Sequence, residues 1–353
     1  MSWATMSRAM MSWATMSRAT MSRPDVGLDT RATTHMSAGM LAYARELAAR
    51  LPRVAPDLRF ATFGAGDNFD VAEQIAIPLQ LWRMRPRLAH FLTPYAPLAV
   101  PVPYVITIHD LIHVRLPQYA KPKARWYFRV VVRRVARAAR RVITDDERTA
   151  QDLVDAYGLD RERIAVIPLG AQPAPVEPIR RERPYVIYVG NRRPHKDIPT
   201  LVAGWESAAA QQPLDLVLTG EPDPILQARP DSGRQIVFLG NLEHGELMRW
   251  VAGAQALVHA SLREGFGLPL LEALQVETPV VASETAVPEV LRPYARTFRA
   301  GDAAGLARAI EAVLEGSDRR VTALGRSVTS TLTWDRCARE TAAIYRTVLQ
   351  ELA

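Results

Sequence analysis

The chain has 353 residues, of which 48% are hydrophobic and 23% charged, the composition of an ordinary globular protein large enough for two domains. Its one cysteine, Cys337, excludes an intrachain disulfide and a thiolate metal site, and no apolar run approaches the roughly 18–20 residues of a membrane span. The net charge of +7 favours an anionic partner, which could be a nucleotide phosphate, an acidic lipid surface or a nucleic acid.

Residues 1–22 contain a nearly perfect direct repeat, MSWATMSRAM followed by MSWATMSRAT. Two copies of such a short unit do not make a solenoid, which needs three or more longer repeats. We interpret this segment as a disordered tail or as a mis-assigned start, with the natural start near Met16 or Met21, and exclude it from the fold.

Residues 23–172 alternate short apolar runs with segments of helical period. The expected strands are VGLD, RFATF, AHFL, YVITIHD and IAVIPLG. SAGMLAYARELAARL is expected to be a helix, with apolar positions at Met40, Tyr43, Ala44 and Leu47. Strands that alternate with helices form parallel sheets covered on both faces, so this part of the chain is expected to be one doubly wound domain.

A long basic helix is expected over residues 124–142, which contain seven arginines and an apolar stripe at helical spacing. The stripe consists of Phe128, Val131, Val132, Val135, Ala138, Ala139 and Val142. The arginines either form the solvated face of a helix that covers the sheet, or make a peripheral contact with an anionic membrane. Since no recognised nucleic-acid-binding module accompanies the charge, we expect no nucleic-acid partner.

Residues 173–184 are rich in proline and charge and are expected to be a linker. The pattern then restarts with YVIYVG, LDLVLTG, QIVFLG, ALVHA and PVVAS, which predicts a second doubly wound domain over residues 185–330. Residues 331–353 are expected to form a last helix that packs back on the first domain. A ligand is expected across the carboxyl ends of the strands.

The stretch SLREGFGLPLLEALQ places two carboxylates on either side of a glycine-rich bend. Gly265 and Gly267 let backbone N–H groups approach a ligand closely, and Pro269 suits the start of a helix. Glu264 is therefore expected on a loop and Glu272 about one turn into a helix. The N-terminus of that helix attracts anions, phosphate above all.

Three blocks of the sequence together resemble the family-4 retaining glycosyltransferases of the GT-B fold: YVGNRRPHKDIPTLVAGW, HASLREGFGLPLLEAL and PVVASETAVPEVL. SAGMLAYARELAARL, ITIHDL and TWDRCARETAAIYRTVL are similar to that family's first glycine loop and helix, its histidine loop and its closing helix. The resemblance covers the chain from Val26 onward. It implies an α/β fold in which two Rossmann-like doubly wound domains face each other across a cleft.

The resemblance implies that Lys196 and a nearby arginine bind the diphosphate of a nucleotide-sugar donor. A lysine at a helix N-terminus opposes the helix dipole, which favours a ligand there over a solvated surface lysine. Relatives often carry arginine directly after the strand glycine, whereas here Gly190 is followed by asparagine and then by Arg192 and Arg193. Either arginine could serve, and we prefer Arg192. His195 stands where relatives commonly carry arginine.

The resemblance also assigns Glu272 to the ribose hydroxyls and Glu264 to a place beside the transferred sugar, where it orients the donor and stabilises positive charge at the anomeric carbon. As alternatives, Glu272 could merely complement a helix N-terminus, and Glu264 could be a surface residue of its loop. The pocket for sugar and phosphate is expected to be lined by the backbone amides of Gly265, Phe266, Gly267 and Leu268.

His109 follows the strand YVITI, and by resemblance it contacts the donor sugar; alternatively, it forms a structural pair with Asp110. Gly39 lies where the family's first glycine loop approaches the diphosphate, or else it simply starts a helix. The catalytic candidates are thus His109, Glu264 and Lys196. The remaining histidines lack metal-ligand spacing and receive no role: His35, His113, His244 and His259.

The resemblance implies a cytoplasmic, metal-independent, retaining hexosyltransferase without a cofactor, peripheral at the inner face of the membrane if the basic helix binds lipid. Its donor would be GDP-mannose or a UDP-hexose, and its acceptor a hydroxyl of a saccharide or of a lipid-linked saccharide. We expect a front-side reaction in which the leaving phosphate deprotonates the acceptor. Two alternatives stay open, a nucleotide-sugar epimerase of the GT-B fold and a catalytically inactive partner subunit.

Overall fold

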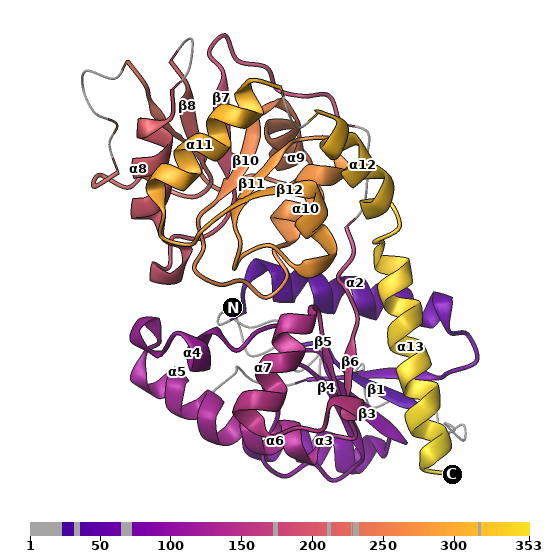
Figure 1. Ribbon diagram of the computed structural model, residues 1–353. Helices are drawn as coiled ribbons and strands as arrows, with labels where there is room; N and C mark the ends of the chain where they lie inside the picture. Colours follow the sequence, from indigo (N-terminus) through magenta and orange to yellow (C-terminus); the bar gives the residue numbers. More distant parts are fainter. Residues whose placement is uncertain are drawn as a thin grey trace, which may run out of the picture.

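The computed structural model describes residues 23–31, 36–64, 73–171, 176–209, 213–226, 228, 233–316 and 319–353. They form two α/β lobes, and the chain ends on the lobe that contains its first strands (Figure 1). The interpretation of residues 1–22 lies outside the described residues, as does the start of the expected linker.

The first lobe is built on a parallel sheet that has six strands within the described residues, in the order β2-β1-β3-β4-β5-β6. The strands are β1 (Val26–Asp29), β2 (Phe60–Phe63), β3 (Leu88–Phe91), β4 (Tyr104–Thr107), β5 (Arg141–Thr144) and β6 (Ile164–Val166). Strands β1, β3 and β4 are buried along their whole length, as expected for parallel strands covered on both faces. The strand order reverses between β1 and β3, so a ligand is expected near the carboxyl ends of these strands.

The second lobe repeats this plan with a parallel sheet in the order β12-β11-β10-β7-β8-β9, the Rossmann order. Its strands are β7 (Tyr185–Tyr188), β8 (Asp215–Leu218), β9 (Ile236–Phe238), β10 (Ala256–His259), β11 (Val280–Ser283) and β12 (Ala295–Phe298). The reversal of order lies between β7 and β10. Two doubly wound α/β lobes confirm the fold class expected from the sequence.

Helices surround both sheets (Figure 1). Those of the first lobe are α2 (Ala38–Val54), α3 (Glu73–Met84), α4 (Ile112–Arg115), α5 (Pro122–Tyr127), α6 (Arg133–Ala138) and α7 (Glu147–Tyr157), with the short turns η1 (Pro117–Tyr119) and η3 (Arg161–Arg163). Those that follow are η4 (Pro194–Lys196), α8 (Ile198–Ser207), α9 (His244–Gly253), α10 (Leu268–Gln275), η5 (Glu289–Tyr294), α11 (Ala303–Leu314), α12 (Arg319–Thr329) and α13 (Trp334–Glu351). In the described part of the chain, none of these helices combines the length and the apolar character that a membrane crossing requires.

The prediction of a single basic helix over residues 124–142 is wrong in two respects. The segment is divided by a π-helical stretch, η2 (Phe128–Val132), that joins α5 to α6, and it ends before strand β5. The wider π-turn shifts the register, so that Ala136 is buried and Ala138 is exposed. Val142 is buried in β5, between β4 and β6, because an apolar strand in the middle of a sheet buries more surface than one more helical turn would.

Within the described residues, the segment that leaves β6 and the segment that leads into α13 lie side by side where the chain passes between the lobes. Ala171 pairs with Thr333, and its N–H donates to the carbonyl of Leu332 at 3.1 Å. A Cβ at Gly170 would lie 2.2 Å from the backbone nitrogen of Trp334, so this close approach requires glycine. The two segments therefore connect the lobes as a tightly packed pair.

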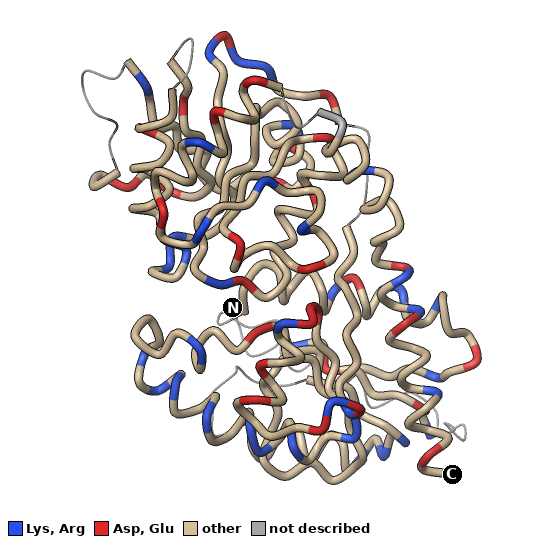
Figure 2. The backbone as a smooth tube through the Cα atoms, in the orientation of Figure 1, with Lys and Arg blue, Asp and Glu red and all other residues tan. Residues whose placement is uncertain are grey.

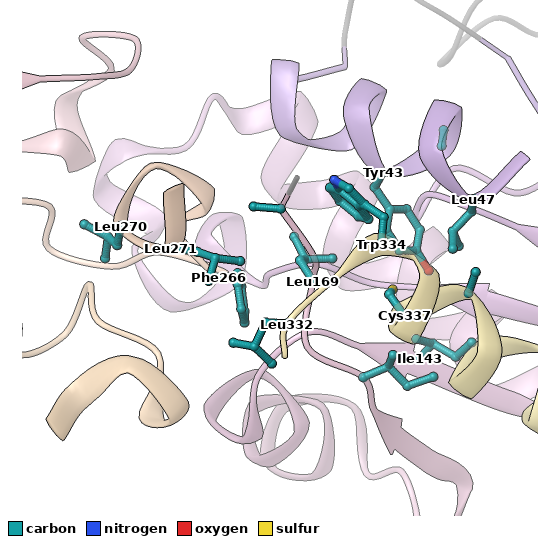
Figure 3. Close-up of a cluster of buried hydrophobic side chains, with 14 of the residues drawn as sticks. Tyr43, Leu47, Ile143, Leu169, Phe266, Leu270, Leu271, Leu332, Trp334 and Cys337 are labelled. Carbon is teal, nitrogen blue, oxygen red and sulfur yellow. The ribbon is translucent and has the colours of Figure 1, made fainter. Parts of the chain in front are cut away.

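One apolar cluster joins the two lobes beside these paired segments. Figure 3 shows Phe266 and Leu271 of the second lobe, Tyr43 of α2, and Leu332 and Trp334 of the second of these segments in the same cluster. Burying an aromatic or aliphatic side chain of this size stabilises a fold by about 1.5–3 kcal/mol. Apolar burial therefore helps to hold the two lobes together in the observed arrangement.

The last helix returns to the first lobe. Helix α13 packs along α2, the hydroxyl of Tyr345 lies 2.5 Å from Nδ1 of His90, and Arg346 forms an ion pair with Asp57 at 2.7 Å. The described part of the linker, residues 176–184, lies on the second lobe, where the N–H of Ile179 donates to the carbonyl of Arg249 at 2.9 Å.

Candidate active site

Two of the expected site residues lie at the carboxyl ends of adjacent strands in the second sheet. Lys196 ends the η4 turn that follows β7, and Glu264 lies on the loop that follows β10. Strands β7 and β10 pair directly, at the place where the strand order reverses. Open α/β sheets bind their ligands at such a point, because the loops on either side of it diverge and leave a crevice.

Lys196 and Glu264 form an ion pair with 2.5 Å between Nζ and Oε1, and their side chains are only 13% and 10% exposed. Nδ1 of His259 lies 3.5 Å from the same carboxylate oxygen. Burial alone would raise the pKa of Glu264, but the Lys196 ammonium and His259 outweigh it and hold the pKa at about 2. Glu264 is therefore a carboxylate at any pH near neutral.

Local backbone geometry holds the glutamate loop in place. A Cβ at Gly265 would lie 2.5 Å from the carbonyl oxygen of His109, so only glycine lets this loop meet the first lobe. Gly267 has φ +76° and forms the N-cap of α10, and Pro269 occupies its first turn. Phe266 is 3% exposed and anchors the loop in the apolar cluster.

Glu272 is the fifth residue of α10, which confirms its expected place about one turn into a helix. Its side chain is 20% exposed, and Oε1 lies 3.7 Å from Nε2 of His244, at the start of α9. Burial raises the pKa of Glu272 to about 7. The two glutamates of this segment thus differ by several pKa units because Lys196 contacts only Glu264 within the described residues.

The N-termini of helices α2 and α10 approach each other between the lobes. Ser37 caps α2 by accepting a hydrogen bond from the N–H of Met40 at 3.3 Å. Gly39 lies in the first turn of α2, and a Cβ there would lie 3.7 Å from Cδ1 of Leu268, the first residue of α10. Each helix N-terminus carries about half a positive charge, so the space beside both is suited to an anion.

His109 follows strand β4 and is buried at the face of the first lobe that meets the second. Its Nδ1 lies 2.6 Å from Oδ2 of Asp145, which follows the neighbouring strand β5. The alternative pairing with Asp110 is wrong, because Oδ1 of Asp110 instead accepts a hydrogen bond from the N–H of Ile112 at 2.9 Å. The ring of Tyr43 meets the imidazole edge to face, with centroids 4.7 Å apart.

The two arginines after Gly190 have different surroundings. Arg192 donates to the carbonyls of Thr219 at 3.1 Å and Glu221 at 2.5 Å, and its guanidinium stacks over the ring of Phe238. These contacts hold Arg192 on the second lobe. Arg193 is exposed, and its positive charge acts to lower the pKa values of Tyr95 and His113, two residues of the first lobe. Of the two, Arg193 is the one whose charge reaches across to the opposite lobe.

Three contacts of the site were missed by sequence reasoning: Asp145 on His109, His259 beside Glu264, and His244 beside Glu272. The first and the last join segments 36 and 28 residues apart along the chain, whereas His259 and Glu264 lie on the same strand and loop. A signal was present for Asp145, which directly follows the strand RVIT as His109 follows YVITI, but the expected helix over residues 124–142 extended into that strand.

Polar contacts from α7 close the lobes on one side of the site. Arg148 donates to the carbonyls of Thr285 at 2.8 Å and Val287 at 2.6 Å, in the segment that follows β11. Oδ1 of Asp146 accepts a hydrogen bond from the N–H of Glu289 at 3.1 Å. In the described structure these contacts hold the two lobes together, with the helix N-termini, the Lys196–Glu264 pair and His109 at the place where the lobes meet.

The sequence matches one family model on each lobe. A model described as Glycosyltransferase Family 4 matches residues 37–175, and a model described as Glycosyl transferases group 1 matches residues 183–316. Among curated proteins, the O-antigen chain mannosyltransferase B of Escherichia coli is 24% identical over 69% of this chain and 70% of its own. The MMP alpha-(1->4)-mannosyltransferase of Mycolicibacterium hassiacum is 28% identical over 71% of this chain and 67% of its own.

Solved structures with the same fold cover nearly the whole chain. Sucrose-phosphate synthase from Thermosynechococcus elongatus superposes with a TM-score of 0.71 and 20% identity, over 93% of this chain and 100% of that one. The Anabaena HepE protein, solved in complex with UDP and glucose, gives a TM-score of 0.69 and 16% identity, over 92% and 100%. With one family model on each lobe and the fold shared by these structures, the chain belongs to the family-4 glycosyltransferases of the GT-B fold.

Proposed function

We propose that the protein is a retaining, metal-independent hexosyltransferase that moves mannose or glucose from a nucleotide-diphosphate sugar to a saccharide hydroxyl, in polysaccharide or glycolipid biosynthesis. The observation that carries this proposal is the largely buried Lys196–Glu264 pair beside two converging helix N-termini. The names of the relatives favour mannose and therefore GDP-mannose, whereas the UDP and glucose of the HepE structure favour a UDP-hexose.

Departure of the nucleoside diphosphate is the step that most needs positive charge. Preorganised cations and backbone amides stabilise such a leaving group without rearranging during the reaction. In our proposal Lys196 and Arg193 hold the diphosphate between the N-termini of α2 and α10, near Gly39 and Leu268. We assign the second cation to Arg193 and not to Arg192, whose guanidinium is occupied by carbonyls of its own lobe.

Glu264 acts on the sugar in this scheme. Its carboxylate stays ionised, so it accepts hydrogen bonds from sugar hydroxyls and stabilises positive charge at the anomeric carbon. His109 contacts the same sugar from the first lobe. The leaving phosphate takes the proton of the acceptor hydroxyl on the face from which it departs, so the configuration at the anomeric carbon is retained.

A thermal-shift panel of nucleoside diphosphates and nucleotide sugars tests the donor, because a ligand that binds the folded state raises Tm. We expect a shift with GDP-mannose or a UDP-hexose that persists in excess EDTA, and transfer of the sugar with retention when an acceptor is added. A change of sugar configuration without an acceptor would instead indicate the epimerase. Absence of both donor binding and transfer would indicate the inactive partner subunit.

The raised pKa of Glu272 predicts how donor binding depends on pH. The carboxyl must be ionised to accept hydrogen bonds from both ribose hydroxyls, and its pKa is raised to about 7. KM for the donor should therefore rise as pH falls below about 7, approaching tenfold per pH unit, because each unit removes most of the remaining carboxylate. Glu272→Gln should raise KM and remove this pH dependence.

The control for this prediction is Glu246→Gln, which neutralises an exposed glutamate of α9. It should leave the KM–pH profile unchanged. A wild-type KM that stays flat from mildly acidic to mildly alkaline pH would exclude Glu272 as the ribose ligand.

We also propose a peripheral contact between the first lobe and an anionic membrane that carries a lipid-linked acceptor. Figure 2 shows lysines and arginines along the segment from α5 to α6. Among the described residues, five arginines of this segment form no ion pair: Arg125, Arg129, Arg133, Arg134 and Arg137. Trp126 and Val130 are 60% and 47% exposed beside them, as in segments that lie at a lipid interface.

Vesicle flotation tests this contact with phosphatidylcholine vesicles that contain or lack phosphatidylglycerol. Each basic residue near an anionic surface contributes about 1 kcal/mol, so Arg129→Ala with Arg133→Ala should weaken binding about 30-fold. Arg45→Ala with Arg53→Ala removes the same charge from exposed positions of α2 and should change binding much less. If both double variants lose vesicle binding equally, the net charge of the protein alone explains the binding. If the wild type does not float with anionic vesicles, the proposed membrane contact is wrong.

A further inference from the structure

We propose that Asp145 is a positioning residue for sugar transfer, whose carboxylate holds His109 so that the second ring nitrogen of the imidazole meets the transferred sugar. This inference rests on the proposed function. Its first support is geometric: Nδ1 of His109 and Oδ2 of Asp145 are 2.6 Å apart, and the residues are 9% and 2% exposed.

The Asp145 carboxylate makes too few hydrogen bonds for its role to be stabilisation of the fold. Within the described residues, its oxygen Oδ1 makes no hydrogen bond, and His109 is the only side chain that hydrogen-bonds to Oδ2. A buried carboxylate usually needs several hydrogen bonds to repay the loss of water, and replacement of a buried ion pair by apolar residues is often neutral or stabilising. An acid kept in such surroundings is best explained by what it does to His109.

The other ring nitrogen of His109 is the atom left for a substrate. Nε2 is buried and completes no hydrogen bond in the described structure. The backbone of Leu92 interacts with the ring and helps to raise the pKa of the imidazole. A sugar hydroxyl that reached Nε2 would supply the hydrogen bond that this nitrogen lacks. The pair thus has one nitrogen bonded to Asp145 and one beside the backbone of Leu92.

The position of the pair in the fold points toward the same role. Thr107 of β4 is in register with Ile143 of β5, so His109 and Asp145 leave neighbouring strands on the same side. The ring of Tyr43 covers one edge of the imidazole, and its hydroxyl lies 2.9 Å from that of Thr107. Gly265, next to Glu264, packs directly on the carbonyl of His109, so the His109–Asp145 pair lies beside the loop that carries Glu264.

Asp145 also controls the protonation of the imidazole. Burial lowers the pKa of His109, but the Asp145 carboxylate outweighs it, and the net pKa is raised. The other titratable groups that act on this pair are Asp110, Asp146, His90, Tyr43 and Cys337. The raised pKa favours the form of the ring that carries a proton on each nitrogen, with Nδ1–H held by Asp145 and Nε2–H able to donate to a sugar oxygen.

The test is a double-mutant cycle on purified full-length protein, with transfer from the donor found in the thermal-shift panel. Asp145→Asn should lower kcat by about tenfold or more, with little change in donor KM, and His109→Ala should lower it at least as much. In the His109→Ala background, Asp145→Asn should have no further effect, because Asp145 acts only through the imidazole. In Asp145→Asn alone, the alkaline limb of kcat should move to lower pH, since the raised pKa falls back.

Asp110→Asn is the matched control, because it removes a neighbouring negative charge and leaves the ring contact intact. It should change kcat less than about threefold. Equal losses from Asp145→Asn with and without His109, or a loss explained by a lower Tm, would overturn the proposal. If the wild type transfers no sugar, the proposed function fails instead, and thermal melts of the same variants still report whether Asp145 is needed for folding.

Discussion

Replacing Glu264 by alanine is expected to lower kcat for sugar transfer by about 10²–10³-fold, the loss found when one preorganised electrostatic contact to a transition state is removed. The physical reason is that Glu264 is ionised, nearly buried and held at 2.5 Å from Lys196. A carboxylate in such a place stabilises positive charge at the anomeric carbon better than water would, because it does not reorient. Steady-state kinetics with donor and acceptor both varied measure the effect.

Stability must be followed in the same variants. Removing one partner of a buried ion pair leaves the other uncompensated and costs about 3–5 kcal/mol in a fully buried pair, less here since both side chains keep some exposure. Glu264→Gln keeps a hydrogen-bond acceptor for Lys196 and should retain the Tm while losing most of the activity. Glu277→Ala, at an exposed position after α10, should be neutral in both assays. Near wild-type transfer by a well-folded Glu264→Ala protein would remove this residue from the mechanism.

Replacing Lys196 by methionine is expected to lower kcat/KM for the donor by about 10²–10³-fold and to weaken binding of the nucleoside diphosphate itself. Lys196 lies at the start of α8, where its charge opposes the dipole of that helix. A diphosphate would gain both the ammonium and the nearby helix N-termini. The ligand-induced shift in Tm should therefore shrink for the free diphosphate as well as for the nucleotide sugar.

The Lys196→Met and Glu264→Gln variants together separate binding from catalysis. If Lys196 serves only as the structural partner of Glu264, Lys196→Met should lower Tm and leave diphosphate binding intact. Under our proposal the two single variants differ: Glu264→Gln keeps diphosphate binding, and Lys196→Met loses it. The double variant should lose less than the sum of the two single losses, because the residues contact each other.

Local sequence patterns were enough to predict the secondary-structure setting of Glu272. Gly267 and Pro269 specify how a helix begins, and the structure starts α10 at Leu268, so Glu272 lies where the local rules put it. The same holds for Tyr43 and Leu47, whose helical spacing predicted the buried face of α2. These features depend on neighbours within a few residues of each other.

The prediction of one helix over residues 124–142 was wrong because the local pattern there was ambiguous. The apolar residues of β5 continue the helical stripe before them, so Val142 fitted a helix as well as a strand. Its place was decided by pairing with β4 and β6, which lie far away along the chain. By sequence either Arg192 or Arg193 could serve and Arg192 was preferred, whereas our proposal takes Arg193 because the carbonyls of Thr219 and Glu221 hold Arg192.

By itself, the sequence determined that the chain has two doubly wound lobes and that a lysine and two glutamates follow strands of the second one, because periodicity, capping and glycine geometry act over short distances. Only the tertiary structure decided that Glu264 meets Lys196, that Asp145 meets His109, and that the N-termini of α2 and α10 converge. Those contacts arise where strands distant in sequence become neighbours in a sheet and where one lobe closes on the other. The pKa values of the site follow from the same contacts, since burial and paired charges exist only in the folded molecule.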